Sequence, residues 1–231
     1  MTAMVPADGS GAMFDRIAQR YDVLNRLMSF GIDRSWRRKL VAAMPDYGSL
    51  LDVATGTGDV ALSLANAYPQ TTVTGLDPSV GMLEVGRSKV ISVKLDGRVS
   101  LEEGDAQNMP YEDDQFSGAC IAFGIRNVPD RVQGLREMKR VTQPGGPIVI
   151  LELSEPRGGI MATLARIHVH HVVPVLGALL SGQKEYRYLQ KSIQAFPPAE
   201  DFCELMRSVG IHNVVAHRLT MGTAHLYIGE A

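Results

Sequence analysis

The stretch LLDVATGTGDVALSLA, residues 50–65, decides the fold that this chain of 231 residues is expected to adopt. Its apolar start predicts a buried strand, its glycines predict a tight turn, and the spacing of Val60 and Leu64 predicts a helix. Gly56 and Gly58, followed by an alanine three positions later, also fit the dinucleotide fingerprint G-x-G-x-x-G/A. The stretch therefore predicts a turn that faces a ligand, and it leaves the kind of ligand open.

The rest of the chain repeats this alternation as far as residue 154. Strands are predicted over residues 49–54, 71–77, 98–105, 117–124 and 147–153, and helices over 59–68, 79–90 and 130–141. Ser79 and Asp130 are expected to cap two of these helices. Later residues predict a helix that Gly210 closes, and an antiparallel hairpin over 211–217 and 223–230. The pattern favours an α/β fold with helices on both faces of a mostly parallel, seven-stranded sheet whose last strand is antiparallel.

Two helical regions accompany this sheet within what we interpret as a single domain over residues 1–231. N-terminal helices are predicted over residues 13–45. Residues 156–198 read as helices without a strand between them. Ligands bind at the carboxyl ends of the strands in such sheets, and we expect residues 156–198 to form a lid there.

Composition and charge exclude several classes of protein. The net charge of −2 and the pI of about 6.3 give no basic field for general nucleic-acid binding. Cys120 and Cys203 lie far apart, so we expect neither a zinc site nor a disulfide, and we expect a reducing, cytoplasmic location. The N-terminus lacks a signal-peptide pattern. The apolar run over residues 167–183 is short for a membrane span, and its HVHH motif has no further ligand nearby in the sequence, so we expect no metal.

Four acids at successive strand ends favour a cationic ligand over a pyrophosphate. Asp59 begins the helix after the turn, where a carboxylate repels phosphate and suits the helix dipole. Asp52 precedes the turn and suits a ligand with an ammonium and a sulfonium group. Asp77 and Asp105 end the next two strands, where they can accept from ribose hydroxyls and an adenine amino group. Asp77 alone fits both ligand classes, but the four acids together favour S-adenosylmethionine over NAD or NADP.

The chain also resembles the ubiquinone/menaquinone biosynthesis C-methyltransferases over nearly its whole length. The similar segments are MFDRIAQRYDVLNRLMSFGIDRSW, AFGIRNVPD, RVTQPGGPIVILELS and YRYLQKSIQAFP. The resemblance implies a Rossmann-like, class I S-adenosylmethionine-dependent methyltransferase fold with a helical lid insertion. It implies cofactor contacts from Gly56, Thr57, Gly58, Asp77, Asp105 and Ala106. Tyr21 is expected either to close over the cofactor or to pack against the domain, and Ala122 can contribute only backbone contacts.

The resemblance implies that a ring carbon of a reduced polyprenyl quinone is methylated. That carbon becomes nucleophilic when a phenol with a pKa near 10 ionises, and bringing this pKa to about 7 corresponds to about 4 kcal/mol. One charged hydrogen bond contributes roughly 1.5–3 kcal/mol, so a base or a bound water is needed as well. Arg126 is the expected donor to the quinol oxygen, with a surface salt bridge as the alternative, and Asn127 is expected to orient that oxygen or a water. Tyr186 and Tyr188 are expected to reach the substrate from the lid, although residues two apart cannot share one helix face.

Departures from the family pattern leave the substrate open. Gln190 and Lys191 replace a common Pro-Glu pair, and Tyr227 stands where histidine is frequent. Demethylmenaquinol is the first expectation. The benzoquinol of the ubiquinone pathway, another phenolic metabolite and a noncatalytic cofactor-binding partner are alternatives, and a dehydrogenase is the weakest one. Basic residues in the lid are expected to bring it to the inner face of the cytoplasmic membrane as a peripheral contact, and a homodimer is a further option.

Overall fold

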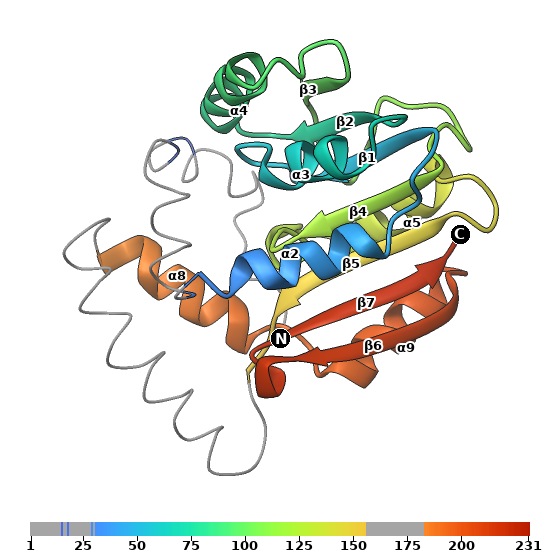
Figure 1. The fold of residues 1–231 in the computed structure, drawn as a ribbon. Helices are drawn as coiled ribbons and strands as arrows, with labels where there is room; N and C mark the ends of the chain where they lie inside the picture. The colour runs from blue at the N-terminus through green and yellow to red at the C-terminus, as the bar shows by residue number, and fades with distance from the viewer. Residues whose placement is uncertain (1–14, 16–17, 19–28, 30, 156–182) are drawn as a thin grey trace.

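The computed structural model describes residues 15, 18, 29, 31–155 and 183–231. Seven strands in this part of the chain form one sheet in the order β3-β2-β1-β4-β5-β7-β6 (Figure 1). The strands are β1 (Ser49–Val53), β2 (Thr72–Asp77), β3 (Val99–Glu103), β4 (Gly118–Ala122), β5 (Pro147–Leu153), β6 (His212–Leu219) and β7 (Ala224–Glu230). The helices are α2 (Asp33–Ala42), α3 (Asp59–Ala67), α4 (Val80–Ser92), α5 (Arg131–Val141), α8 (Gln183–Gln194) and α9 (Ala199–Ser208), with the 3₁₀ turns η1 (Ile125–Asn127) and η3 (Thr220–Gly222).

The direction of the strands confirms the predicted sheet. β1 to β5 pair in parallel, and β7 is antiparallel to both of its neighbours, β5 and β6. The predicted hairpin is therefore present, and its second strand lies between β5 and β6. Chain order reverses between β1 and β4, which lie side by side at the centre. This reversal is the switch point at which open α/β sheets bind ligands, outside the carboxyl ends of the strands.

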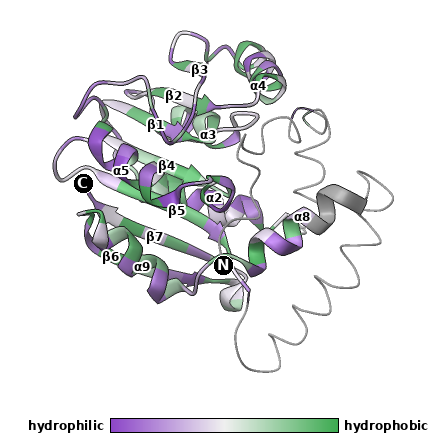
Figure 2. Cartoon of the chain, turned by 180° about the vertical axis from the view of Figure 1, so that it is seen from behind, coloured by the Kyte–Doolittle hydropathy of each residue, from purple (hydrophilic) through white to green (hydrophobic). Residues whose placement is uncertain are grey.

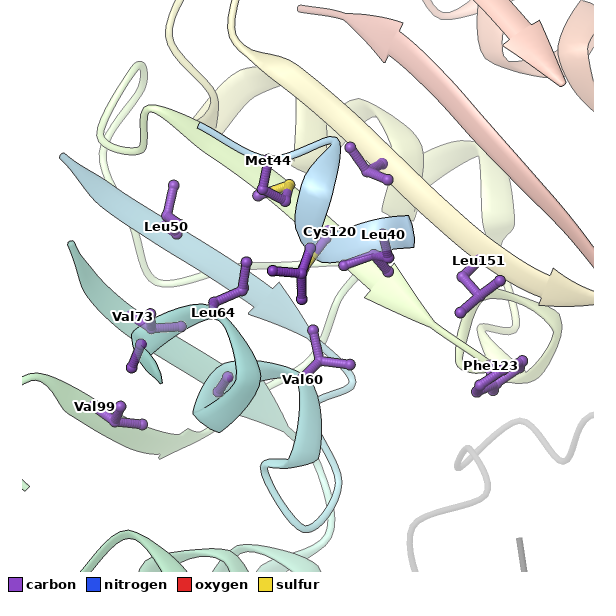
Figure 3. Close-up of a cluster of buried hydrophobic side chains, with 14 of the residues drawn as sticks. Leu40, Met44, Leu50, Val60, Leu64, Val73, Val99, Cys120, Phe123 and Leu151 are labelled. Carbon is purple, nitrogen blue, oxygen red and sulfur yellow. The ribbon is translucent and has the colours of Figure 1, made fainter. Parts of the chain in front are cut away.

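The two faces of the sheet carry separate apolar cores. One core joins the sheet to α2, α3 and α4, and Figure 3 shows part of it, with Leu40 of α2 beside Cys120 of β4 and with Leu64 of α3 and Leu50 of β1 in the same cluster. The other joins the sheet to α5 and α9 and includes the fully buried ring of Tyr227. The central strands are accordingly coloured as largely hydrophobic in Figure 2. Helices on both faces leave the strand ends as the accessible rim of the sheet.

Local signals set the helix ends as the sequence predicts. The Ser79 side chain accepts a hydrogen bond of 3.2 Å from the backbone N–H of Met82 at the start of α4. Asp130 accepts one of 3.0 Å from the N–H of Gln133 at the start of α5. Gly210 follows α9 with a φ of +84°, a left-handed conformation that favours glycine. Each cap satisfies orphan backbone groups that the helix itself leaves unpaired.

The predicted helical regions are described only in part. α2 falls within residues 13–45, and α8 falls within residues 156–198 and contacts η1 at the carboxyl end of β4. The remainder of both regions, including residues 156–182, lies outside the described residues, so the boundaries of the lid stay a prediction. Within the described ranges, no helix combines the length and the apolar character that crossing a bilayer requires.

Candidate active site

The carboxyl ends of β1 and β4 meet in two turns that share an unusual backbone shape. Ala54 follows β1 with a φ of +51°, and Phe123 follows β4 with a φ of +59°, although neither is a glycine. A Cβ added to Gly124 would lie 2.6 Å from the Cβ of Ala54. The close approach at this position requires glycine, and it packs the two turns against each other at the switch point.

The glycine turn leads directly from β1 into α3. Gly56 has a φ of +58° and Gly58 a φ of +79°, so both occupy the left-handed region. A Cβ at Gly56 would meet no atom within 4 Å, whereas one at Gly58 would contact Leu101 at 3.4 Å. The turn is therefore packed underneath at Gly58 and open at Gly56, where a ligand can approach the backbone.

Asp52 lies beneath this turn, with an exposed fraction of only 1%. Its Oδ2 accepts hydrogen bonds of 2.6 Å from the Thr55 hydroxyl and 3.1 Å from the Ala61 N–H. Burial raises the pKa of this carboxyl to about 6, while the Thr55 bond opposes the rise. The carboxylate braces the turn and the first turn of α3, and its contact to a ligand ammonium group stays a prediction.

Asp77 connects the end of β2 to the glycine turn. Its Oδ2 accepts a hydrogen bond of 2.8 Å from the Gly56 N–H, and its Oδ1 accepts one of 2.9 Å from the Ser79 N–H. Burial raises its pKa to about 6, and the nearby charge of Asp15 adds to the rise. Each carboxylate oxygen keeps a second lone pair, so Asp77 can still accept from the two hydroxyls of a ribose.

The charge of Asp59 is compensated, which the sequence argument did not anticipate. Lys89 of α4 donates hydrogen bonds of 2.7 Å to Asp59 and 2.8 Å to the hydroxyl of Thr57. Both side chains of this ion pair are about a quarter exposed. Asp59 therefore repels a phosphate less than a lone carboxylate would, and its part in the preference for a sulfonium ligand is smaller than the sequence indicates.

The adenine-side residues lie in the loop after β3. Asp105 is exposed and accepts hydrogen bonds from the backbone and side-chain nitrogens of Gln107. Ala106 follows it and is half-buried, as is Ala122 at the end of β4. The loop is fixed at its far end, where the Met109 N–H donates a hydrogen bond of 2.8 Å to Glu137 of α5. Asp105 and Ala106 thus follow the carboxyl end of β3, Ala122 is the last residue of β4, and the binding roles of all three stay predictions.

Arg126 is held inside the protein by a strand-end glutamate. Its exposed fraction is 5%, and its Nη1 donates to Glu152 Oε1 at 2.5 Å and to the Phe123 carbonyl at 2.6 Å. Glu152 is fully buried and also accepts from the backbone N–H groups of Arg126 and Leu153. Arg131 donates to the Arg126 carbonyl. Arg126 Nε is buried without a hydrogen-bond partner and Nη2 has none among the described residues, so the edge of the guanidinium formed by these two nitrogens lacks an acceptor in this part of the chain.

Asn127 joins the end of β4 to the predicted lid. Its Oδ1 accepts a hydrogen bond of 3.2 Å from the hydroxyl of Tyr188 in α8. Its Nδ2 lies 3.5 Å from the Phe123 carbonyl, a long contact that leaves the Nδ2 donor available to a ligand. Tyr186 belongs to the same helix, but its side chain lies outside the described residues, as does the whole of Tyr21.

The structure also identifies site residues that the sequence analysis gave no role. Glu152 is the partner of Arg126, Lys89 the partner of Asp59, and Asp15 lies within hydrogen-bond distance of Ser79. A glutamate inside the apolar run PIVILEL was the available signal for Glu152, because a buried strand charge needs a partner. Among residues 15, 18, 29, 31–155 and 183–231, no group of three or more His, Cys, Asp and Glu side chains could hold a metal ion. The HVHH motif lies outside these ranges.

Comparisons with known proteins extend this geometry. The family model described as the ubiE/COQ5 methyltransferase family matches residues 5–230. A ubiquinone/menaquinone biosynthesis C-methyltransferase UbiE from Geotalea daltonii is 48% identical over 222 residues, which are 94% of this chain and 94% of the relative. A demethylmenaquinone methyltransferase from Deinococcus radiodurans is 42% identical over 94% of this chain and 90% of its own.

Solved structures support the fold. A SAM-dependent methyltransferase from Thermotoga maritima matches with a TM-score of 0.67 and 21% identity, over 95% of this chain and 98% of its own. The [4+2]-cyclase SpnF matches with a TM-score of 0.69 and 20% identity, over 92% of this chain and 75% of its own. Since one fold serves such different reactions, these structures inform the architecture alone. The match to the family model and the identity to curated relatives over nearly the whole chain show that this protein belongs to the ubiE/COQ5 methyltransferase family.

Proposed function

We propose that this protein transfers a methyl group from S-adenosylmethionine to a ring carbon of a reduced polyprenyl quinone, with demethylmenaquinol as the first substrate. The observation that carries the proposal is that two groups of residues lie next to each other at the switch point, one on the β1 side and one on the β4 side. Gly56 and Asp77 form a nucleoside cradle on the β1 side, and Arg126, Asn127 and Tyr188 form a polar group on the β4 side. The relatives, a ubiquinone/menaquinone biosynthesis C-methyltransferase and a demethylmenaquinone methyltransferase, supply the substrate class.

The residues of the glycine turn fit the proposed cofactor. The open backbone at Gly56 leaves room for a ligand, and Asp77 retains acceptor capacity for ribose hydroxyls. When bound, S-adenosylmethionine supplies a sulfonium methyl group, which a ring carbon of the quinol takes up while the ring hydrogen leaves as a proton. Gly58, Thr57, Asp105, Ala106 and Ala122 complete the expected binding set, with Asp52 supporting it from below.

Arg126 and Asn127 act on the quinol oxygen in this proposal. The Arg126 guanidinium offers Nη2 to the oxygen, and Glu152 fixes the other side of the group so that little reorganisation is needed. Asn127 adds a donor or holds the water that carries the phenol proton away. Tyr188 fixes the Asn127 amide from the lid side. The charged donor contributes roughly 1.5–3 kcal/mol and the neutral amide roughly 0.5–1.5 kcal/mol, so a water or base that takes the proton is still needed to reach the roughly 4 kcal/mol that ionising the phenol requires.

The quinone tail is proposed to reach the active site from a membrane surface. The sequence of the lid combines the apolar run VVPVLGALL with Arg157, Arg166, Lys184, Arg187 and Lys191. Such a combination suits peripheral contact with anionic lipid. Sedimentation with anionic and with neutral vesicles tests this part separately, and equal binding to both would remove the electrostatic contribution.

The reaction is tested by mass spectrometry of the product. The purified protein is given S-adenosylmethionine together with reduced demethylmenaquinone or the demethylated benzoquinol, side by side. The expected result is one added methyl group on the ring carbon of demethylmenaquinol. Preferential methylation of the benzoquinol would assign the chain to the ubiquinone pathway. Binding of S-adenosylmethionine without turnover of either quinol would refute the quinone proposal and favour another phenol or a binding role.

A further inference from the structure

Asp15 is an acid from the N-terminal region that lies against the beginning of α4. Its Oδ1 accepts a hydrogen bond of 2.6 Å from the Ser79 hydroxyl and one of 2.9 Å from the Gly81 N–H. The Ser79 hydroxyl in turn accepts from the Met82 N–H. A carboxylate at this position also suits the positive end of the helix dipole. Asp15 is thus joined to the first turn of a helix 64 residues away along the chain.

This contact continues without a break to the glycine turn. Ser79 donates its backbone N–H to Asp77 Oδ1, and Gly56 donates its own to Asp77 Oδ2. The path Asp15–Ser79–Asp77–Gly56 therefore links the N-terminal region to the group that faces the ligand. Ser79 is the pivot, because its side chain meets Asp15 while its backbone meets Asp77.

We propose that Asp15 is a positioning residue of the cofactor site, which acts through Ser79 to hold Asp77 in the orientation that binds the ribose. This inference rests on the proposed function, since it takes the ligand of Asp77 to be the nucleoside of S-adenosylmethionine. Without Asp15, the Ser79 hydroxyl and the Gly81 N–H turn to water and the first turn of α4 loosens. The Ser79 N–H then holds Asp77 less firmly, and the nucleoside binds to a less ordered carboxylate.

Gly81 provides a way to displace Asp15 without changing its charge. A Cβ at Gly81 would lie 3.0 Å from Asp15 Oδ1 and 3.3 Å from its Cα. Valine adds two methyl groups beyond that Cβ, so Gly81→Val pushes Asp15 away from α4. Valine is also a better helix former than glycine, so the substitution does not lower the intrinsic helix propensity of α4. Gly97→Val is the matched control, because a Cβ at Gly97 meets nothing within 4 Å.

The test measures the affinity of the full chain for S-adenosylmethionine by titration calorimetry, beside the unfolding temperature without ligand. We expect Asp15→Ala and Gly81→Val to weaken binding on the order of tenfold, which corresponds to about 1.4 kcal/mol. Asp15→Asn keeps the oxygen acceptor and should retain most of the affinity, and Gly97→Val should match the wild type. The unfolding temperature of Gly81→Val is expected to stay at or above that of the wild type.

The outcomes separate the two proposals. Wild-type affinity in Gly81→Val would overturn the positioning role of Asp15 and leave the proposed function standing. If the unfolding temperature and the affinity both fell in Asp15→Ala and in Gly81→Val, Asp15 would serve only the stability of α4. That result would also overturn the inference. Absence of S-adenosylmethionine binding in the wild type would instead refute the proposed function.

Discussion

The buried ion pair between Arg126 and Glu152 makes the sharpest prediction about this protein. The two side chains are 6% and 0% exposed, so each charge stays largely shielded from water if its partner is removed. Breaking such a pair by removing one partner costs about 3–5 kcal/mol, whereas replacing both partners is often nearly neutral. We therefore expect Arg126→Met and Glu152→Gln each to lower the free energy of unfolding by about 3 kcal/mol or more. At roughly 2–4 °C per kcal/mol for a chain of this size, the unfolding temperature falls by about 6 °C or more.

The double variant separates stability from catalysis. The double variant removes both buried charges, and glutamine at position 152 keeps one carbonyl oxygen for one of the two backbone N–H groups, of residues 126 and 153, that now donate to separate oxygens of Glu152. Arg126→Met with Glu152→Gln should therefore recover most of the lost stability and none of the methyl transfer. Urea unfolding of the wild type, both single variants and the double variant gives the coupling energy. Asp113→Asn is the control, because the Asp113 side chain paired with Arg140 is 73% exposed and should cost less than about 1 kcal/mol.

Two results would refute this reasoning. Single variants within about 1 kcal/mol of the wild type would show that the pair is not a desolvated ion pair in solution. Loss of S-adenosylmethionine binding in the folded double variant would show that Arg126 serves the cofactor and not the quinol oxygen.

Further predictions concern the two sides of the switch point. Asp52, with its pKa raised to about 6 by burial, binds its proton more tightly in the folded state, so the stability it contributes is lost as pH rises from 3.8 to about 6. Urea unfolding at pH 4.5 and pH 7 should therefore show a smaller fall for Asp52→Asn than for the wild type, and an equal fall would contradict the assignment. Tyr188→Phe removes the hydroxyl that fixes Asn127, so the KM for the quinol should rise several-fold. Titration should give an unchanged Kd for the cofactor, and a changed Kd would mean that Tyr188 serves the cofactor site. Gly124→Ala brings a Cβ to 2.6 Å from the Cβ of Ala54, so thermal unfolding should show a destabilisation of about 1–3 kcal/mol. Stability equal to that of the wild type would mean that the two turns separate easily.

Local patterns in the sequence predicted the parts of this fold that local physics controls. The glycine turn, the caps at Ser79 and Asp130 and the left-handed Gly210 depend on neighbours in the chain, and all four were recognised. The place of β7 between β5 and β6 was not predicted, because it depends on which strand buries more apolar surface. Tyr227 of β7 is fully buried, whereas β6 exposes most of its residues and forms the edge.

The candidate site shows the same division. Gly56 was predicted as a ligand contact from the glycine turn and the family resemblance, and Asp77 from its strand end; the structure joins them by a hydrogen bond. The inward pairing of Arg126 with Glu152 was not predicted, because the two lie 26 residues apart and meet only when β4 and β5 pair. Sequence spacing indicates which strand end a side chain follows, but not whether its charge is already neutralised by a neighbour.

The left-handed residues after β1 and β4 carry a consequence for the evolution of this protein. Each non-glycine residue in that conformation costs roughly 1–2 kcal/mol, and Ala54 and Phe123 both adopt it at the ligand-facing rim. Glycine would relax either turn, but at position 123 it would remove a ring that packs near Trp36 and beneath the Arg37 guanidinium. Glycine is therefore expected to be tolerated at position 54, where only a methyl group is lost, and to be disfavoured at position 123, where the lost ring contacts offset the relief of backbone strain.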